Sequence, residues 1–134
     1  MKLMKTLAQT LLPALILGLV MSVCAADRTA ASADKLRHVV AFKFKPTATH
    51  EQIKQVEDAF RDLKRKIREI QDYECGTNVS KEGRNKGCTH AFILTFKSDS
   101  DRDTYIDHPA HKEFGKLVGP VLDDAFVIDF WTKN

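Results

Sequence analysis

Apolar residues recur along this chain with two different periods. In residues 36–45, LRHVVAFKFK, alternate side chains are apolar or aromatic over most of the length, which predicts a β-strand. Residues 49–70 instead place apolar residues three and four apart, which predicts an amphipathic helix with one buried stripe. Thr49 followed by Gln52 is a capping-box pattern, so we expect the helix to begin directly after Thr49. The stripe consists of Ile53, Val56, Phe60, Leu63, Ile67 and Ile70.

Residues 73–96 predict two strands joined by a polar loop. The loop spans residues 80–87, where two glycines and an asparagine favour turn conformations. If the strands pair across that loop, Cys75 lies opposite Phe92 and is about 13 Å from Cys88, beyond disulfide reach. A tighter turn would bring the two cysteines opposite each other, and an oxidising compartment would favour a bridge. The sequence leaves this disulfide open.

The remaining segments predict a second helix and a final strand. Ser98 or Ser100 is the expected N-cap of a helix that runs toward residue 108. Pro109 disfavours a helical conformation at the residue before it and suits the first position of a new helix. We therefore expect Pro109 to divide this helix into two pieces. Residues 125–131, AFVIDFW, alternate as a last strand.

The element order is β-α-β-β-α-β, which predicts an α+β, ferredoxin-like fold. In that fold a four-stranded antiparallel sheet carries two helices on one face, and its other face is bare. We expect apolar residues on the bare face, and the simplest partner to cover them is a second copy of the chain in a two-fold homodimer. The residues expected there are Val39, Ala41, Ile93, Val127 and Trp131.

The N-terminal segment has the layout of a secretory signal peptide. Lys2 and Lys5 precede an apolar run that ends in small residues, so we expect residues 1–26 to be the signal peptide. Residues 27–35 are small and polar and predict a flexible spacer, and residues 36–134 predict one domain. The apolar run is too short and too interrupted for a membrane span. We therefore expect an exported protein, periplasmic or secreted, with lipid anchoring through Cys24 as the alternative.

Charge excludes one class of partner. The chain has 21 Lys+Arg against 18 Asp+Glu, and two of the lysines belong to the leader, so the domain is close to neutral. A near-neutral domain lacks the basic surface that binds nucleic acid. We expect no nucleic-acid partner.

Three segments together resemble the stress-responsive dimeric α/β barrel domain family. They are HVVAFKFKP, GCTHAFILTF and YIDHPAHKEFG, and the resemblance covers residues 36–131. It implies a homodimer whose two sheets close into a dimeric α+β barrel. A plant polyketide cyclase of this family uses a tyrosine and a histidine from the third segment, which match Tyr105 and His111 here. The resemblance also extends to His38 and His90.

The candidate site lies between the sheet and the helices. The main expectation is binding of a small molecule, and the alternative is a cyclase-like enzyme that acts on a polyketide-like carbonyl compound. For that alternative Tyr105 and His111 are the candidate catalytic pair: a histidine base near neutral pH and a tyrosine that donates to a developing oxyanion. The surrounding pocket, mostly apolar with a few polar groups, would bind a small hydrophobic or aromatic molecule. The residues expected to bind the ligand are His38, Val40, Phe42, Phe60, His90, Phe92, His108 and Phe114.

Two other interpretations of the histidines remain open. His108 could cap the helix that begins at Pro109, while His111 could bond a backbone carbonyl at the bend, so both would be structural. Alternatively, they could bind zinc or copper with His38 or His90. No carboxylate or cysteine stands at a recognised metal-ligand spacing, and no glycine loop of a nucleotide site is present. We therefore expect neither metal nor cofactor.

Overall fold

The computed structural model describes residues 34–133. The predicted signal peptide, its Cys24 and residues 27–33 of the predicted spacer lie outside the described residues. Lys35, the last residue of the predicted spacer, is hydrogen-bonded to Thr132. Its N–H donates to Thr132 Oγ1 at 2.8 Å, and its carbonyl accepts from Thr132 N–H at 2.9 Å. The ordered pairing of the domain therefore begins one residue before the first strand.

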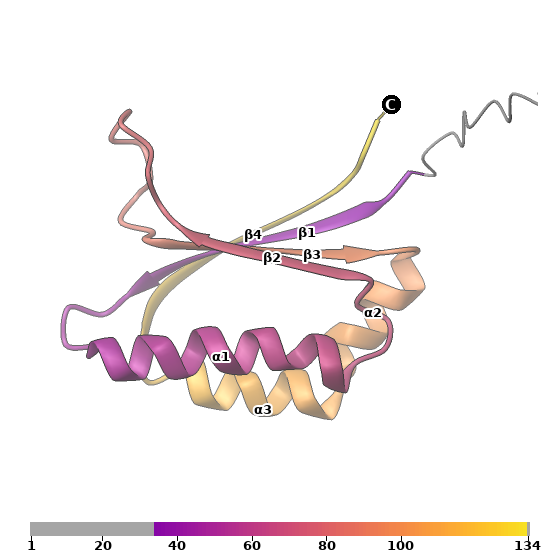
Figure 1. The fold of residues 1–134 in the computed structure, drawn as a ribbon, viewed down its shortest axis with the longest axis horizontal. Helices are drawn as coiled ribbons and strands as arrows, with labels where there is room; N and C mark the ends of the chain where they lie inside the picture. The colour runs from indigo at the N-terminus through magenta and orange to yellow at the C-terminus, as the bar shows by residue number, and fades with distance from the viewer. Residues whose placement is uncertain (1–33, 134) are drawn as a thin grey trace, which may run out of the picture. The chain divides into compact units, whose positions relative to one another are not determined.

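Four strands form one antiparallel sheet in the order β2-β3-β1-β4 (Figure 1). The first and last strands are neighbours in the sheet, with β1 in a central position and β4 at one edge. This is the predicted ferredoxin-like arrangement, and it is confirmed. The strands are β1 (Leu36–Phe44), β2 (Asp72–Thr77), β3 (His90–Phe96) and β4 (Leu122–Trp131).

The helices lie on one face of the sheet, as predicted (Figure 1). The first, α1 (His50–Lys66), begins with the expected capping box: Gln52 N–H donates to Thr49 Oγ1 at 3.2 Å and Thr49 N–H to Gln52 Oε1 at 2.9 Å. It ends four residues earlier than the apolar stripe predicts. Ile67 is the C-cap in an extended conformation, and a turn keeps it and Ile70 buried in the core.

Pro109 divides the second helix, as predicted. The pieces are α2 (Asp99–Asp107), capped by Ser98, and α3 (Pro109–Val118), so the fold has three helices rather than two. The residue between them, His108, is extended with φ −63° and ψ 135°, as expected for the residue before a proline. The bend turns α3 to pack beside α1 under the sheet.

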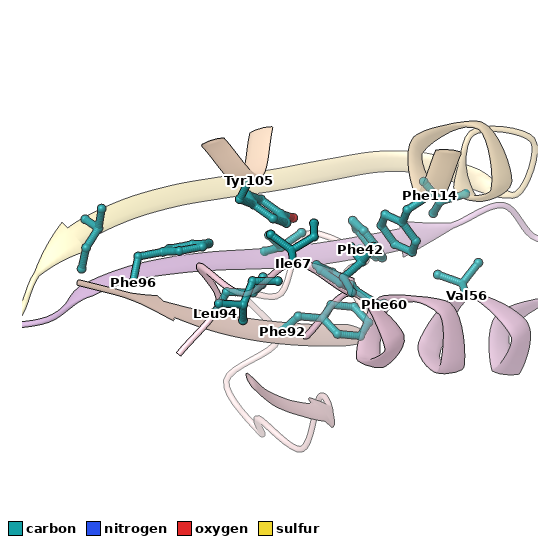
Figure 2. Packing of buried hydrophobic residues seen from close by; sticks show 14 of the residues in the cluster. Phe42, Val56, Phe60, Ile67, Phe92, Leu94, Phe96, Tyr105 and Phe114 are labelled. Atoms are coloured by element: carbon teal, nitrogen blue, oxygen red, sulfur yellow. The ribbon is translucent and has the colours of Figure 1, made fainter. Parts of the chain in front are cut away.

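The core between sheet and helices is aromatic (Figure 2). Phe60 of α1 is its centre, with ring centroids 4.6 Å from those of both Phe92 and Phe114. Burying each such side chain stabilises the fold by roughly 1.5–3 kcal/mol. Five residues predicted to bind a ligand, all buried, belong to this packed core: Val40, Phe42, Phe60, Phe92 and Phe114.

The bare face of the sheet differs from the prediction in its fourth strand. Val39, Ala41 and Ile93 lie on it, as expected. Val127 and Trp131 do not, because Val127 pairs with the buried Val40 and Trp131 with the buried Leu36, which places both on the helix side. The bare face instead receives the other three alternating residues of β4: Phe126, Ile128 and Phe130. These three side chains are 59%, 48% and 48% exposed.

The pairing of β2 with β3 settles the open disulfide. Cys75 lies opposite Phe92 and Thr77 opposite His90, which is the register predicted for a loop over residues 80–87. Cys75 and Cys88 are accordingly both free cysteines in the structure.

Candidate functional site

A histidine and an aspartate face each other across β1 and β4. His38 and Asp129 are register partners on the helix side of the sheet. His38 Nδ1 donates to Asp129 Oδ1 at 2.6 Å. Because the Nδ1 position carries that proton, Nε2 is the unprotonated nitrogen of the neutral ring. The register of the two strands thus places Asp129 where its carboxylate fixes the tautomer of the His38 ring.

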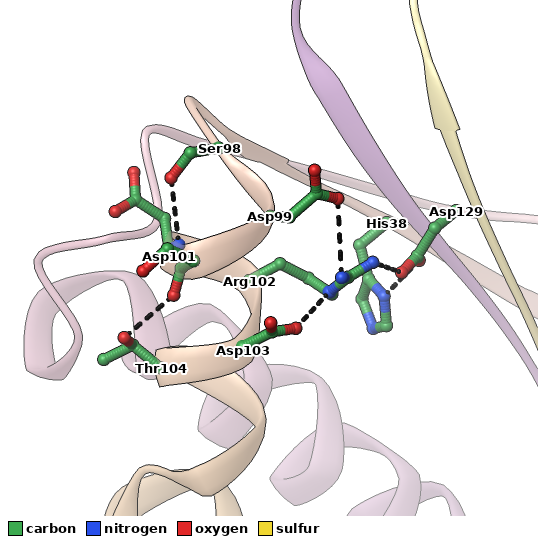
Figure 3. Close-up of polar contacts among 9 residues, drawn as sticks. His38, Ser98, Asp99, Asp101, Arg102, Asp103, Thr104 and Asp129 are labelled. Atoms are coloured by element: carbon green, nitrogen blue, oxygen red, sulfur yellow. Dashed lines mark hydrogen bonds and ion pairs between the residues drawn. The ribbon is translucent and has the colours of Figure 1, made fainter.

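Arg102 connects the pair of His38 and Asp129 to α2, the helix from which it projects (Figure 3). Its Nη1 donates to the second oxygen of Asp129, Oδ2, at 2.8 Å. The same guanidinium lies 3.4 Å from Asp99 and 2.9 Å from Asp103. Asp129 therefore receives a hydrogen bond on each oxygen, one from His38 and one from Arg102.

The electrostatics keep His38 neutral and Asp129 charged. Burial of the His38 ring lowers its pKa below the ordinary value of 6.5, although Asp129 opposes the shift. Burial alone would raise the pKa of Asp129, but the hydrogen bonds from Arg102 and His38 outweigh it and lower that pKa. At neutral pH the negative charge rests on Asp129 and is balanced by Arg102.

Tyr105 projects from α2 into the buried core between the helices and the sheet (Figure 2). It is 1% exposed, and its ring centroid lies 5.5 Å from that of His38 and 5.3 Å from that of Phe96. Burial and the nearby charge of Asp129 raise the pKa of its hydroxyl, so Tyr105 keeps its proton. No hydrogen bond to another residue of the range 34–133 occupies that hydroxyl, which leaves it available as a donor.

His111 of α3 completes the group. Its Nδ1 lies 3.0 Å from the carbonyl oxygen of Ile106, which can only accept, so Nδ1 carries the proton and Nε2 is free to act as a base. The Ile106 carbonyl is available because Ala110 N–H bonds to His108 rather than continuing a helix. The half-buried His111 ring has its centroid 4.3 Å from that of Tyr105.

His108 has the structural role that the sequence left open. Its Nδ1 accepts a hydrogen bond from Ala110 N–H at 3.1 Å, which makes it the N-cap of α3. It borders a shallow surface hollow of about 480 Å³ together with Pro109 and residues of α2. His108 was predicted to bind the ligand, but its side chain caps α3 and does not belong to the buried group around Tyr105.

His90, predicted to bind the ligand with His38, lies away from His38, Tyr105 and His111. His90 pairs with Phe42, while His38 pairs with Leu94, four residues further along β3. Four residues of strand correspond to about 13 Å. His90 Nε2 instead lies 3.5 Å from Glu57 of α1. The Tyr105 ring packs against the ring of His38 on one side and that of His111 on another, so these side chains fill the space beside it.

Two residues of the site were missed by sequence reasoning. Neither Asp129 nor Arg102 was among the residues predicted for the site. One signal was present: Asp129 is the only charged residue in the apolar run AFVIDFW. A lone carboxylate in such a strand needs a partner, and His38 opposite it supplies one.

The described residues offer neither a metal site nor a membrane span. Within residues 34–133, no three His, Cys, Asp or Glu side chains gather as metal ligands would. None of the helices in that same range combines the length and the apolar character needed to cross a bilayer.

The stability of the fold should depend on pH through His38. Its folded pKa lies below the unfolded value of 6.5, so the unfolded chain takes up this proton first as pH falls. Stability is then full above about pH 6.5 and declines as pH falls through the folded pKa of His38. Asp129, whose pKa is also lowered, adds a further loss only below about pH 3.8.

Urea unfolding at about pH 7 and about pH 5 measures this dependence. The wild type should lose more unfolding free energy between the two than the His38→Gln variant, which keeps an N–H donor for Asp129 but does not titrate. Equal losses in the two proteins would contradict the assignment to His38.

Known proteins resemble this chain over the whole described domain. The family model described as Stress responsive A/B Barrel Domain matches residues 36–132. The stress-response A/B barrel domain-containing protein HS1 of Arabidopsis thaliana is 34% identical over 71% of this chain and 87% of its own length. Olivetolic acid cyclase of Cannabis sativa is 27% identical over 74% of this chain and 98% of its own length.

Solved structures share the fold. A hydroxynitrile lyase from Passiflora edulis superposes with a TM-score of 0.71 at 26% identity, covering 75% of this chain and 95% of that one. A dimeric ferredoxin-like protein from Thermobifida fusca superposes with a TM-score of 0.65 at 25% identity, covering 75% and 93%.

Proposed function

The chain belongs to the stress-responsive A/B barrel domain family, and on that premise we propose that it is an acid–base enzyme. Its substrate is a small, largely apolar carbonyl compound, bound between α2, α3 and the helix side of the sheet. His111 removes a proton from the carbon beside the carbonyl. Tyr105 donates a hydrogen bond to the carbonyl oxygen as negative charge develops there.

The single observation that carries this proposal is the state of His111. Its Nδ1 proton is committed to the carbonyl of Ile106 at 3.0 Å, so the free nitrogen is the one able to accept a proton. The partly exposed ring can meet a ligand from solvent. Tyr105 beside it remains protonated, because burial raises its pKa. A base and a hydrogen-bond donor thus stand side by side, 4.3 Å apart between ring centroids.

His38, Asp129 and Arg102 act behind this pair. Asp129 holds a negative charge under Tyr105, which further raises the pKa of that hydroxyl and keeps it a donor rather than a phenolate. Arg102 fixes Asp129 from α2, and Asp129 fixes the His38 ring against Tyr105. These two hydrogen bonds hold the His38 ring, and that ring packs against Tyr105 and keeps the tyrosine in position.

Two relatives support an enzyme of this kind. One is named a cyclase and the other a hydroxynitrile lyase, so this fold serves as an enzyme on small organic molecules in both. We take from them only that this fold can carry an enzyme.

Deuterium exchange tests the proposal without knowledge of the natural substrate. In D₂O, removal of an α-proton from 4-phenyl-2-butanone and return of a deuteron erases the α-proton signal in the proton NMR spectrum. The intact protein should accelerate this loss over buffer, with saturation in the ketone. A rate equal to that of buffer at every ketone concentration would contradict it.

A second candidate function is binding of a small hydrophobic molecule without turnover. It is favoured by the burial of Tyr105, whose ring packs against those of His38 and His111, so that its hydroxyl meets a reacting molecule only if the bend opens. Chemical-shift changes of α2 and α3 amides on addition of the ketone, with no exchange, would select this candidate.

Within the same proposal, the protein acts as a homodimer joined through the bare sheet face. The apolar residues of β4 on that face support it, as does the dimeric state named for the protein from Thermobifida fusca.

We also propose that the protein is exported, periplasmic or secreted, on the strength of the basic head, apolar run and small residues of its first 26 residues. Intact mass measurement of protein from its own host should show a chain that begins at Ala26 or Asp27. A chain that begins at a lipid-modified Cys24 would select the anchored alternative, and a chain that retains Met1 would contradict export.

A further inference from the structure

The helix α2 is attached to the rest of the domain by few side chains. Within its range, Asp99–Asp107, only Tyr105 is buried, whereas α1 buries three residues and α3 buries two. The next residue of α2, Ile106, is apolar but 44% exposed. Elements with few buried apolar contacts open locally at the lowest cost in free energy. We therefore expect α2 to separate from the sheet more easily than the other two helices.

One ion pair connects α2 to the sheet (Figure 3). Arg102 Nη1 lies 2.8 Å from Asp129 Oδ2 of β4. The other acidic partners of Arg102, Asp99 and Asp103, belong to α2 itself. Within residues 34–133, Asp129 is thus the only salt-bridge partner of Arg102 outside its own helix. We call the pair of Arg102 and Asp129 the latch.

Extended residues bound α2 at both ends. Ser98 joins it to β3 with φ −152° and ψ 162°, and His108 joins it to α3 with φ −63° and ψ 135°. The bond between His111 and the Ile106 carbonyl lies beside His108, so it holds the helix at that end only. Rotation about Ser98 and His108 therefore moves α2 as a rigid body and leaves the hydrogen bonds within α1 and α3 intact.

The closed position of α2 hides the hydrogen-bond donor of the proposed reaction. Tyr105 is 1% exposed, and its ring lies against those of His38, Phe96 and His111. A substrate carbonyl from solvent meets the Tyr105 hydroxyl only after this ring has moved. Because the ring projects from α2, movement of that helix away from the sheet carries Tyr105 with it and uncovers His38.

We propose that α2 is a lid over the acid–base site, held shut by the latch and hinged at Ser98 and His108. When the latch breaks, α2 turns away from β4, Tyr105 leaves the core, and a small molecule can enter. When the latch forms again, Tyr105 returns beside the bound molecule. The use of this lid rests on the proposed function, whereas its opening does not.

Amide hydrogen exchange of the intact protein, followed by mass spectrometry, measures the opening. In the wild type, residues 102–107 should exchange at least about ten-fold faster than the core of α1, each relative to its intrinsic rate. Arg102→Ala removes the latch but keeps a strong helix former, and should speed exchange in α2 by about a further ten-fold. Exchange in α1 and α3 should stay at the wild-type rate. Arg65→Ala, which removes an arginine paired only within α1, should leave α2 unchanged.

A second variant makes the test specific to the latch. Asp129→Asn removes the charge at the other end and keeps an oxygen that can accept from His38, and it should also speed exchange in α2. The double variant with Arg102→Ala should exchange no faster than Arg102→Ala alone, because both changes break the same contact.

Three results would overturn the lid. They are equal protection of α1 and α2 in the wild type, an equal rise in all three helices with Arg102→Ala, and additive effects of the two substitutions. The experiment needs no ketone. It therefore decides whether α2 opens even if the ketone assay contradicts the proposed enzyme.

Discussion

Replacing Ile128 by aspartate should convert the homodimer into monomers. Ile128 lies on the bare face beside Val39, in the middle of the apolar set that includes Phe126 and Phe130. In a two-fold dimer each substitution places two carboxylates in the interface, and burying an unpaired charge costs several kcal/mol. Each 1.4 kcal/mol is a factor of about ten, so we expect the dissociation constant to rise by about 100-fold or more.

Sedimentation velocity across a range of concentrations measures this change. Val127→Asp is the matched control, because Val127 is the next residue of the same strand and is 53% exposed, but faces the helix side. The control should remain dimeric. A wild-type protein that is monomeric at micromolar concentration, or a dimer that tolerates Ile128→Asp and dissociates with Val127→Asp, would show that the bare face is not the interface.

The second large effect concerns Tyr105 and His111 in the deuterium-exchange assay. His111→Gln retains an N–H donor for the Ile106 carbonyl but removes the base, and should reduce the exchange rate by about 10²–10⁴-fold. Tyr105→Phe keeps the buried ring and removes the hydrogen bond to the developing oxyanion, with an expected loss of about 10²–10³-fold. His50→Ala, which removes an exposed histidine at the start of α1, should leave the rate unchanged.

Unfolding of the same variants separates catalysis from structure. If the two residues are catalytic, both variants should keep nearly wild-type stability, because Tyr105→Phe retains the buried ring and His111→Gln retains the bond to the Ile106 carbonyl. If their role is only structural, exchange should be no faster than in buffer for every protein. His111→Gln should then lose about 0.5–1.5 kcal/mol if glutamine fails to bond the Ile106 carbonyl.

Local patterns were sufficient for the elements of the fold. The capping box at Thr49 and the break at Pro109 depend on contacts between residues a few positions apart, so they could be predicted and were confirmed. The end of α1 could not, because Ile67 and Ile70 stay buried whether the backbone continues as a helix or as a turn. Burial of a stripe thus constrains side chains more strongly than it constrains the last helical residue.

The sequence by itself determined the ferredoxin-like order of elements and the bend at His108. It also indicated that Tyr105 and His111, on either side of that bend, belong to one site. Only the tertiary structure decided which alternate set of β4 faces the helices. A period of two shows that Val127, Asp129 and Trp131 share a side, but the register with β1 determines which side that is. That register brings Asp129 to His38 and Arg102. The position of His90 four residues along β3 from the partner of His38 keeps it away from Tyr105. Sequence patterns did not predict these contacts, because they join residues far apart in the chain.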